Sequence, residues 1–169
     1  MSQSTQQHRE AAPKAVRCAV VTVSDTRTLE NDRGGQLLAE SLTAAGHSVI
    51  RREIVPDEPN RIRSLVEELA DATMLDAILV TGGTGIAARD QTYETVSELL
   101  TKTLPGYGEL FRMLSYEDIG PAAMLSRTIG GVIGQVVLLT MPGSPAAVRL
   151  ALDKLILPEL AHVVFEARK

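Results

Sequence analysis

The chain has 169 residues, with 17 Lys and Arg against 21 Asp and Glu, which gives a net charge of −4. This length suits one domain, and the acidic balance excludes the general basic field that attracts nucleic acid. Aromatic residues make up 3% of the chain and tryptophan is absent, which argues against a base-stacking surface for single-stranded nucleic acid.

The N-terminal residues 1–14 are mostly polar, so we expect them to form a disordered tail rather than a secretory signal. No later segment approaches the length of an apolar membrane span. The sequence therefore predicts a cytoplasmic protein without a membrane partner, in which residues 15–169 form the folded domain.

The first predicted strand, residues 16–23, is a nearly continuous apolar run of the kind that is covered on both faces of a sheet. Cys18 lies within it, and we interpret this single thiol as a small buried hydrophobe rather than a nucleophile. After a loop through Gly35, the apolar spacing predicts a helix that ends at Gly46, which suits a left-handed cap. Residues 48–55 are predicted to form the second strand.

The next elements repeat this alternation of strand and helix. Residues 56–59 form a predicted turn, and Asn60 is expected to cap a helix with a 3.6-residue apolar period. Residues 76–81 form a short apolar third strand that runs straight into a glycine-rich loop. Strands that alternate with helices in this way predict parallel right-handed crossovers, and therefore an α/β fold with a doubly wound, mostly parallel sheet.

The second half of the chain is predicted to complete the same domain. Thr92 is expected to cap a helix that is broken at Pro105, and helical segments follow at residues 110–116 and 122–126. Two strands, residues 128–133 and 135–140, are expected to pair across a turn at Gly134. The remaining residues predict a long helix that bends at Pro158.

Four predicted loops should meet at one edge of this sheet, because ligands of open parallel sheets bind outside the carboxyl ends of the strands. These loops are residues 24–27, 56–58, 81–90 and 142–144. We therefore expect them to form a single site.

The loop at residues 81–85, Thr-Gly-Gly-Thr-Gly, has the composition of a phosphate site. Its glycines free the backbone to turn N–H groups toward an anion, and its two threonines add hydroxyl donors. A purely structural glycine turn is the alternative. Residues 83–88 match the dinucleotide fingerprint G-x-G-x-x-A, but on the third strand instead of the first, and no P-loop lysine motif occurs.

Carboxylates near this loop predict a divalent cation, for which Mg²⁺ is the natural choice. Asp90 close behind a phosphate loop would be repelled by the ligand unless a cation lay between them. Asp57, at the neighbouring strand end, could supply a second oxygen ligand or could be a simple turn residue, and Asp25 could position substrate or metal. Arg89 could pair with a phosphate or be solvated.

Other polar residues at the predicted site have weaker signals. Ser126 and Arg127 could present a hydroxyl and a guanidinium, although helix-end capping also explains them. Residues 142–145, Pro-Gly-Ser-Pro, could offer N–H groups to an anion or form an ordinary strand-to-helix turn. None of the three histidines joins this constellation, which disfavours acid–base hydrolysis through imidazole.

Six motifs in register resemble the molybdenum cofactor biosynthesis proteins of the MoaB/MogA type, from about residue 16 to the C-terminus. They are VSD at 23–25, VPDE at 55–58, TGGTG at 81–85 with RDQT at 89–92, PGYGE at 105–109, LSR at 125–127 and MPGSP at 141–145. Residues 111–120, FRMLSYEDIG, resemble the MoaB branch more than MogA. Where the family usually has Pro-Glu-Ala, residues 93–95 are Tyr-Glu-Thr, which keeps the carboxylate.

The resemblance implies a three-layer α/β/α domain that assembles as a homotrimer or homohexamer. It implies adenylation of molybdopterin by Mg²⁺-ATP with release of pyrophosphate, and contacts with other proteins of the pathway. Catalysis would come from positioning and charge neutralisation, without a protein nucleophile. Asp57 and Asp90 would serve metal binding and catalysis, and the substrate-binding candidates are Ser24, Asp25, Thr81, Gly82, Gly83, Thr84, Gly85, Arg89, Thr92, Glu94, Ser126, Arg127, Pro142, Gly143 and Ser144.

Two alternatives to this enzyme stay open at the level of sequence. One is a binding or scaffold protein that holds molybdopterin without chemistry. The other is a nucleotide pyrophosphatase of the related competence-damage type, which is disfavoured because the chain has no room for a companion domain.

Overall fold

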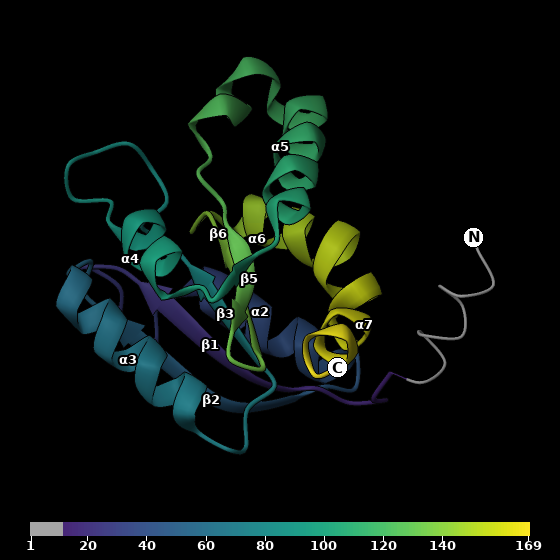
Figure 1. The fold of residues 1–169 in the computed structure, drawn as a ribbon. Coiled ribbons are helices and arrows are strands. Elements are labelled where there is room, and N and C mark those ends of the chain that lie inside the picture. The colour runs from purple at the N-terminus through teal and green to yellow at the C-terminus, as the bar shows by residue number, and fades with distance from the viewer. Residues whose placement is uncertain (1–11) are drawn as a thin grey trace.

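The computed structural model describes residues 12–169, so the predicted tail lies almost entirely outside the described residues. Strands and helices alternate through most of this part of the chain (Figure 1). The elements are β1 (Arg17–Val23), α2 (Arg33–Ala44), β2 (Ser48–Val55), α3 (Pro59–Asp71), β3 (Ala77–Thr81), α4 (Thr92–Leu99), β4 (Lys102–Thr103), α5 (Pro105–Ile119), the 3₁₀ helix η1 (Gly120–Leu125), β5 (Gly130–Ile133), β6 (Val136–Met141), α6 (Pro145–Ala151), the π-helical turn η2 (Leu152–Ile156) and α7 (Leu157–Ala167).

The strands form one six-stranded sheet in the order β2-β1-β3-β6-β5-β4. The pairs β1–β2, β1–β3 and β3–β6 are parallel, whereas β5 is antiparallel to both β6 and β4. The predicted mostly parallel, doubly wound sheet in a single domain is thereby confirmed. The strand β4 was not predicted, because two exposed residues at an edge leave no periodic signal.

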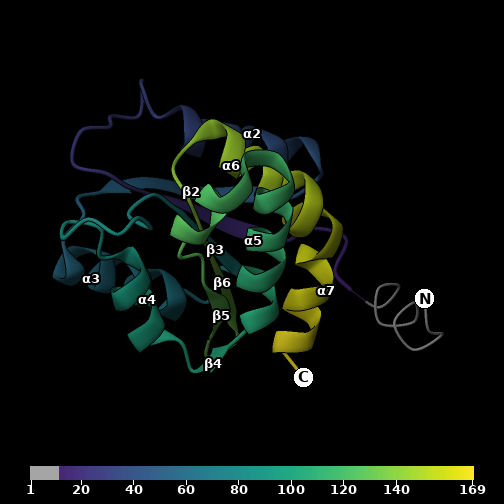
Figure 2. The ribbon, with the colours of Figure 1, turned by 90° about the horizontal axis from the view of Figure 1, so that it is seen from above.

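Helices cover both faces of the sheet and make three layers (Figures 1 and 2). Along β1, Cys18 and Val20 belong to the apolar cluster beneath α2, α5, α6 and α7, while Ala19 and Val21 belong to the cluster beneath α3 and α4. All four side chains are at most 1% exposed. Burial also raises the pKa of the Cys18 thiol to about 12, which confirms a buried hydrophobe.

The start of α2 differs from the prediction of a loop through Gly35. Asp32 caps the helix by accepting a hydrogen bond from the Gly35 N–H at 2.9 Å, so Gly34 and Gly35 lie inside the first turn. A Cβ at Gly35 would be 2.1 Å from Asp32 Oδ2. The two glycines allow close packing here and do not mark a loop.

Three other helix starts also differ from the sequence predictions. Neither Asn60 nor Thr92 is the residue before its helix, because α3 starts at Pro59 after Glu58 and α4 starts at Thr92 after Gln91. Pro105 is the first residue of α5, whereas we expected it to break a helix. Both Pro59 and Pro105 occupy the first helical position, where their missing N–H needs no partner.

The bend expected at Pro158 takes the form of a π-helical turn. The backbone widens over η2, immediately before Pro158 in α7. Proline lacks the N–H that would continue the α-helical ladder, and a single π turn accommodates this loss while Leu152 and Ile156 stay buried. Within residues 12–169, no helix is long and apolar enough to cross a membrane.

Asp76 connects distant parts of the chain just before β3. Its side chain accepts hydrogen bonds from the Arg17 guanidinium at 2.7 Å and from Arg168, and it also accepts one from the Arg17 N–H. Burial pushes the pKa of Asp76 upward, but the bonds from Arg17 and Arg168 outweigh it and hold the pKa below its ordinary value.

We expect Asp76→Asn to destabilise the protein by about 1–3 kcal/mol at pH 7, because two guanidinium groups lose their charged partner. A depressed carboxyl pKa in the folded state contributes stability above the unfolded value and loses it as pH falls through the folded pKa. The difference from wild type should therefore be full at pH 7 and should shrink below about pH 4. Urea unfolding at several pH values measures it, and a difference that grows with acidity would contradict the assignment.

Candidate functional site

The carboxyl ends of four parallel strands lie side by side at one edge of the sheet. Val23 of β1 is in register with Val55 of β2, and Thr81 of β3 is in register with both Thr22 of β1 and Met141 of β6. The polar segments that follow these strands are therefore brought together, as the sequence predicts.

The three glycines of the glycine loop, residues 82–85, are packed so tightly against their neighbours that a Cβ at any of them would lie within 2.6 Å of another atom. Gly82 has φ +98°, and a Cβ on it would lie 2.3 Å from the Val23 carbonyl oxygen. Thr81 is fully buried and its hydroxyl donates to the Pro142 carbonyl at 3.1 Å. Thr81 thus connects the β3 and β6 loops, and the Gly82 N–H adds a second link by donating to the Met141 carbonyl at 3.0 Å. The N–H groups of residues 83–85 remain to face a ligand.

Asp57 lies beneath this loop and is 6% exposed. Its Oδ1 accepts a hydrogen bond from the Gln91 N–H at 3.0 Å, and Oδ2 lies 2.6 Å from the point that a Cβ on Gly83 would occupy. Burial raises the pKa of Asp57, and the negative charges of Asp90 and Asp25 raise it further. A bound cation would reverse this penalty.

Asp90 faces the same loop from the other side. Its Oδ2 accepts a hydrogen bond from the Ala87 N–H at 2.9 Å and lies 2.6 Å from the Cβ position of Gly85. Among residues 12–169, Asp57 Oδ2 and Asp90 Oδ1 have no hydrogen-bond donor. Two carboxylates that each keep a free oxygen beside the glycine loop fit Mg²⁺, which binds one or two carboxylates together with substrate phosphates.

A larger protein cage for a metal is not present in the described part of the chain, where no cluster of three or more His, Cys, Asp or Glu could hold an ion. Asp25 does not point a free carboxylate at Asp57 or Asp90. Instead, it accepts two hydrogen bonds from the Arg89 guanidinium, at 2.7 and 2.8 Å, and one from the Asp57 N–H at 3.0 Å. The hydrogen bond from Arg89 holds the pKa of Asp25 below its ordinary value. Arg89 is thus paired with a carboxylate.

The guanidinium group of Arg127 is hydrogen-bonded to the loops of the site. Its guanidinium donates to the carbonyl oxygens of Gly85 at 2.7 Å and Asp90 at 3.1 Å, and also to Glu94. The same group lies 5.4 Å from the centre of the Tyr93 ring. Glu94, whose pKa this hydrogen bond lowers, is therefore a partner of Arg127. Arg127 therefore holds residues 85–90 in position. The sequence left open whether it binds a ligand or caps a helix end, and the structure shows neither role.

We define the apolar hollow as the cavity of about 420 Å³ between the glycine loop and α5. Its walls combine Gly82–Gly85, Asp90 and Ser126 with the side chains of Phe111, Ile119 and Leu125. The Ser126 hydroxyl is buried there without a hydrogen-bond partner in the structure. The hollow suits a flat ring that can satisfy this hydroxyl.

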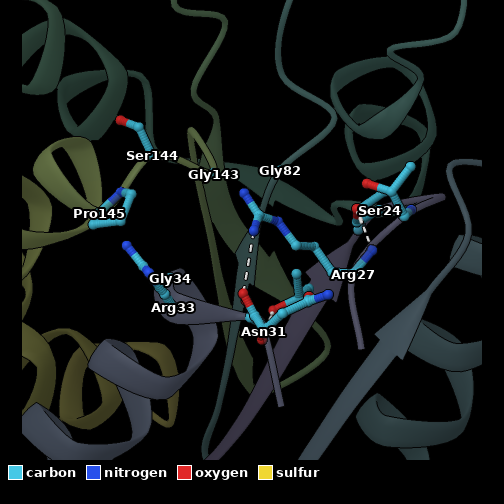
Figure 3. A pocket seen from close by; sticks show the side chains of 13 residues that line it. Ser24, Arg27, Asn31, Arg33, Gly34, Gly82, Gly143, Ser144 and Pro145 are labelled. Carbon is cyan, nitrogen blue, oxygen red and sulfur yellow. Dashed lines mark hydrogen bonds between the residues drawn. The ribbon is translucent and has the colours of Figure 1, made fainter. Parts of the chain in front are cut away.

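We define the arginine pocket as the cavity of about 680 Å³ on the other side of Gly82, shown in Figure 3. It lies between the segment linking β1 to α2 and the start of α6, and it shares Gly82, Gly143 and Ser144 with the apolar hollow. The Ser144 hydroxyl also caps α6 by accepting from the Ala147 N–H at 3.2 Å. The two cavities are therefore adjacent and meet at these three residues.

Sequence reasoning found the arginine pocket only in part. Of its walls, Ser24, Gly82, Gly143 and Ser144 were predicted to bind substrate, and Arg27 lay in a loop that was predicted to join the site, whereas Arg33 was not singled out. The available signal was the segment Asp-Arg-Gly-Gly at residues 32–35, in which Asp32 caps α2 and Arg33 is the first helical residue, at the wall of the pocket. That signal was lost because the glycines were interpreted as a loop.

We expect Gly82→Ala to destabilise the protein by at least about 2 kcal/mol, since alanine pays for the positive φ and its Cβ collides with a backbone carbonyl. Gly106→Ala is the matched control, because a Cβ there meets no atom within 4 Å and φ is not positive. Urea unfolding of both variants tests the packing. Equal stability of the two variants would show that the loop adjusts freely.

Comparison with known proteins yields one family and close relatives over nearly the whole chain. The family described as "Probable molybdopterin binding domain" matches residues 19–162. A molybdenum cofactor biosynthesis protein B from Bacillus cereus is 55% identical over 167 residues, which cover 98% of this chain and 99% of the relative.

The solved structures that resemble this fold come from the same family as the sequence relatives. A crystal structure of a molybdenum cofactor biosynthesis protein B has a TM-score of 0.90 at 57% identity and covers 93% of this chain and 98% of its own. The tungsten cofactor synthesizing protein MoaB from Pyrococcus furiosus has a TM-score of 0.84 at 37% identity, with 94% of this chain and 100% of that chain covered.

Proposed function

Because this chain belongs to the MoaB/MogA family of molybdenum cofactor biosynthesis proteins, whose domain is described as molybdopterin-binding, we propose that it transfers an adenylyl group from ATP to molybdopterin. In this reaction a phosphate oxygen of molybdopterin attacks the α-phosphorus of ATP, and pyrophosphate leaves. The observation that carries the proposal is the pair Asp57 and Asp90, each with a free carboxylate oxygen, beside a loop whose three glycines leave no room for a Cβ.

The residues of the site support positioning rather than covalent catalysis. The glycine loop presents backbone N–H groups, and Arg127 holds Gly85 and Asp90 in place by hydrogen bonds to their carbonyl oxygens. Mg²⁺ bound by Asp57 and Asp90 would neutralise charge on the phosphates. The apolar hollow offers a surface for the ring of one substrate. Because the proposed reaction consumes ATP, we place the protein in the cytoplasm.

We expect Asp90→Asn to fold normally but to lose roughly a hundredfold or more of its Mg²⁺-dependent release of pyrophosphate in the presence of molybdopterin and ATP. The substitution removes a negative charge that would hold Mg²⁺, and losing the metal's stabilisation raises the barrier of adenylyl transfer by several kcal/mol. A coupled pyrophosphate assay measures it. Asp71→Asn, at the exposed end of α3, is the matched control and should retain wild-type activity.

Each outcome of this assay separates the proposed enzyme from its alternatives. Undiminished turnover by Asp90→Asn would contradict the assigned role of Asp90. Molybdopterin binding with background pyrophosphate release by the wild type would identify a binding or scaffold protein. Hydrolysis of ATP without the pterin would identify a nucleotide pyrophosphatase.

We also propose that the protein is a homo-oligomer that assembles through α5 and η1, as a trimer or a hexamer. Large apolar side chains on these elements remain between 47% and 78% exposed, namely Leu110, Met113, Tyr116, Ile119, Met124 and Leu125. The opposite face of α5 is occupied, since Tyr107 and Phe111 are buried in the core. An apolar group of this size on a surface helix is typical of a protein interface.

We expect Met113→Glu to shift the protein toward monomers, because it would place a charge in the apolar interface. Met74→Glu, at an equally exposed methionine before β3, should leave the assembly unchanged. Light scattering after size exclusion reports the mass of each variant. A wild-type monomer, or an intact oligomer of Met113→Glu, would refute this interface.

A further inference from the structure

The arginine pocket is a second compartment of the site, and no substrate group has been assigned to it above. It has about 680 Å³, against about 420 Å³ for the apolar hollow, and the two compartments meet at Gly82, Gly143 and Ser144. A molecule that lies across the glycine loop can therefore extend from one into the other.

The pocket has an excess of positive charge. Arg27 and Arg33 line it and are exposed, and neither has a carboxylate within 4.0 Å among residues 12–169. Arg27 donates to the Asn31 carbonyl at 3.1 Å, and Figure 3 shows its side chain extending into the pocket. These guanidinium groups are available to an anion.

The acidic residue in the wall, Asp32, does not cancel this charge. Asp32 is 3% exposed, and its carboxylate accepts hydrogen bonds from Thr22 at 2.8 Å, the Gly35 N–H at 2.9 Å and Arg52 at 3.0 Å. The ion pair with Arg52 neutralises it inside the protein. The net charge that a ligand meets in the pocket is therefore that of Arg27 and Arg33.

The remaining walls favour a compact polar group over a ring. The Ser24 hydroxyl accepts from the N–H groups of Thr26 and Arg27, both at 3.2 Å, and so keeps its own proton to donate. Gly34 approaches Gly143 closely, since a Cβ on Gly34 would be 3.1 Å from the Gly143 carbonyl oxygen. No aromatic residue lines the pocket, whereas Phe111 lines the apolar hollow.

We propose that the arginine pocket binds the β- and γ-phosphates of ATP and holds pyrophosphate as it leaves, a proposal that rests on the adenylyl transfer above. When the pterin phosphate bonds to the α-phosphorus, the bond from that phosphorus to the β-bridging oxygen breaks, and its electron pair stays on pyrophosphate. Arg27 and Arg33 neutralise the charge that develops there.

The test is calorimetric titration of inorganic pyrophosphate into the metal-free protein in EDTA, where only residues of the chain can hold the anion. We expect about tenfold weaker binding for Arg27→Gln and for Arg33→Gln, and about a hundredfold for the double variant. Arg149→Gln, an exposed arginine of α6 outside the pocket, is the control and should bind as the wild type does. Urea midpoints establish that all variants are folded.

A second titration with AMP identifies which phosphates the pocket holds. AMP lacks the β- and γ-phosphates, so its affinity should not change in the double variant. The proposal would be overturned if the double variant bound pyrophosphate as tightly as the wild type does. It would also be overturned if the double variant lost affinity for AMP as strongly as for pyrophosphate. If the double variant loses pyrophosphate but the wild type shows no adenylation, the anion pocket stands and the proposed reaction fails.

Discussion

The close approach of the glycine loop to the segments that follow β1 and β6 is the constraint on which the rest of the site depends. Gly82 has a positive φ and no room for a Cβ, because the Val23 carbonyl occupies that space. Gly143 lies next to it, and a Cβ there would be in van der Waals contact with the Gly82 Cα at 3.4 Å. This contact separates two compartments of different chemistry and brings them within reach of one ligand.

Much of the fold could be predicted because each strand carries a dense local signal. Residues 48–55 match β2 at both ends, and the apolar runs of β1 and β3 are wrong by one residue at most. The comparisons also confirm the family that the ordered motifs indicated. Helix starts were harder, because Pro59, Pro105 and Gly35 are compatible with both a turn and a first helical turn, and only tertiary contacts choose between them.

The residues of the candidate site were harder to predict from the sequence than the strands of the fold. The sequence placed Asp57 and Asp90 near the glycine loop, which the parallel register explains. It could not show that Arg89 and Arg127 are held by protein partners, since Arg89 and its partner Asp25 are 64 positions apart. Nor could it show that Arg27 and Arg33 have no carboxylate partner within residues 12–169. Which arginines are available to a ligand is decided by long-range pairing.

The carboxylate of Asp76 fastens the two ends of the folded domain to one point. It binds Arg17 at the start of β1 and Arg168 just after α7, and it stands at the amino end of β3, across the sheet from the glycine loop. Arg17 and Arg168, near the two ends of the described residues, therefore lie at the edge opposite the cavities of the site. Such a domain can be built into longer chains, in tandem or with another enzyme, while its reactive edge stays open to substrates.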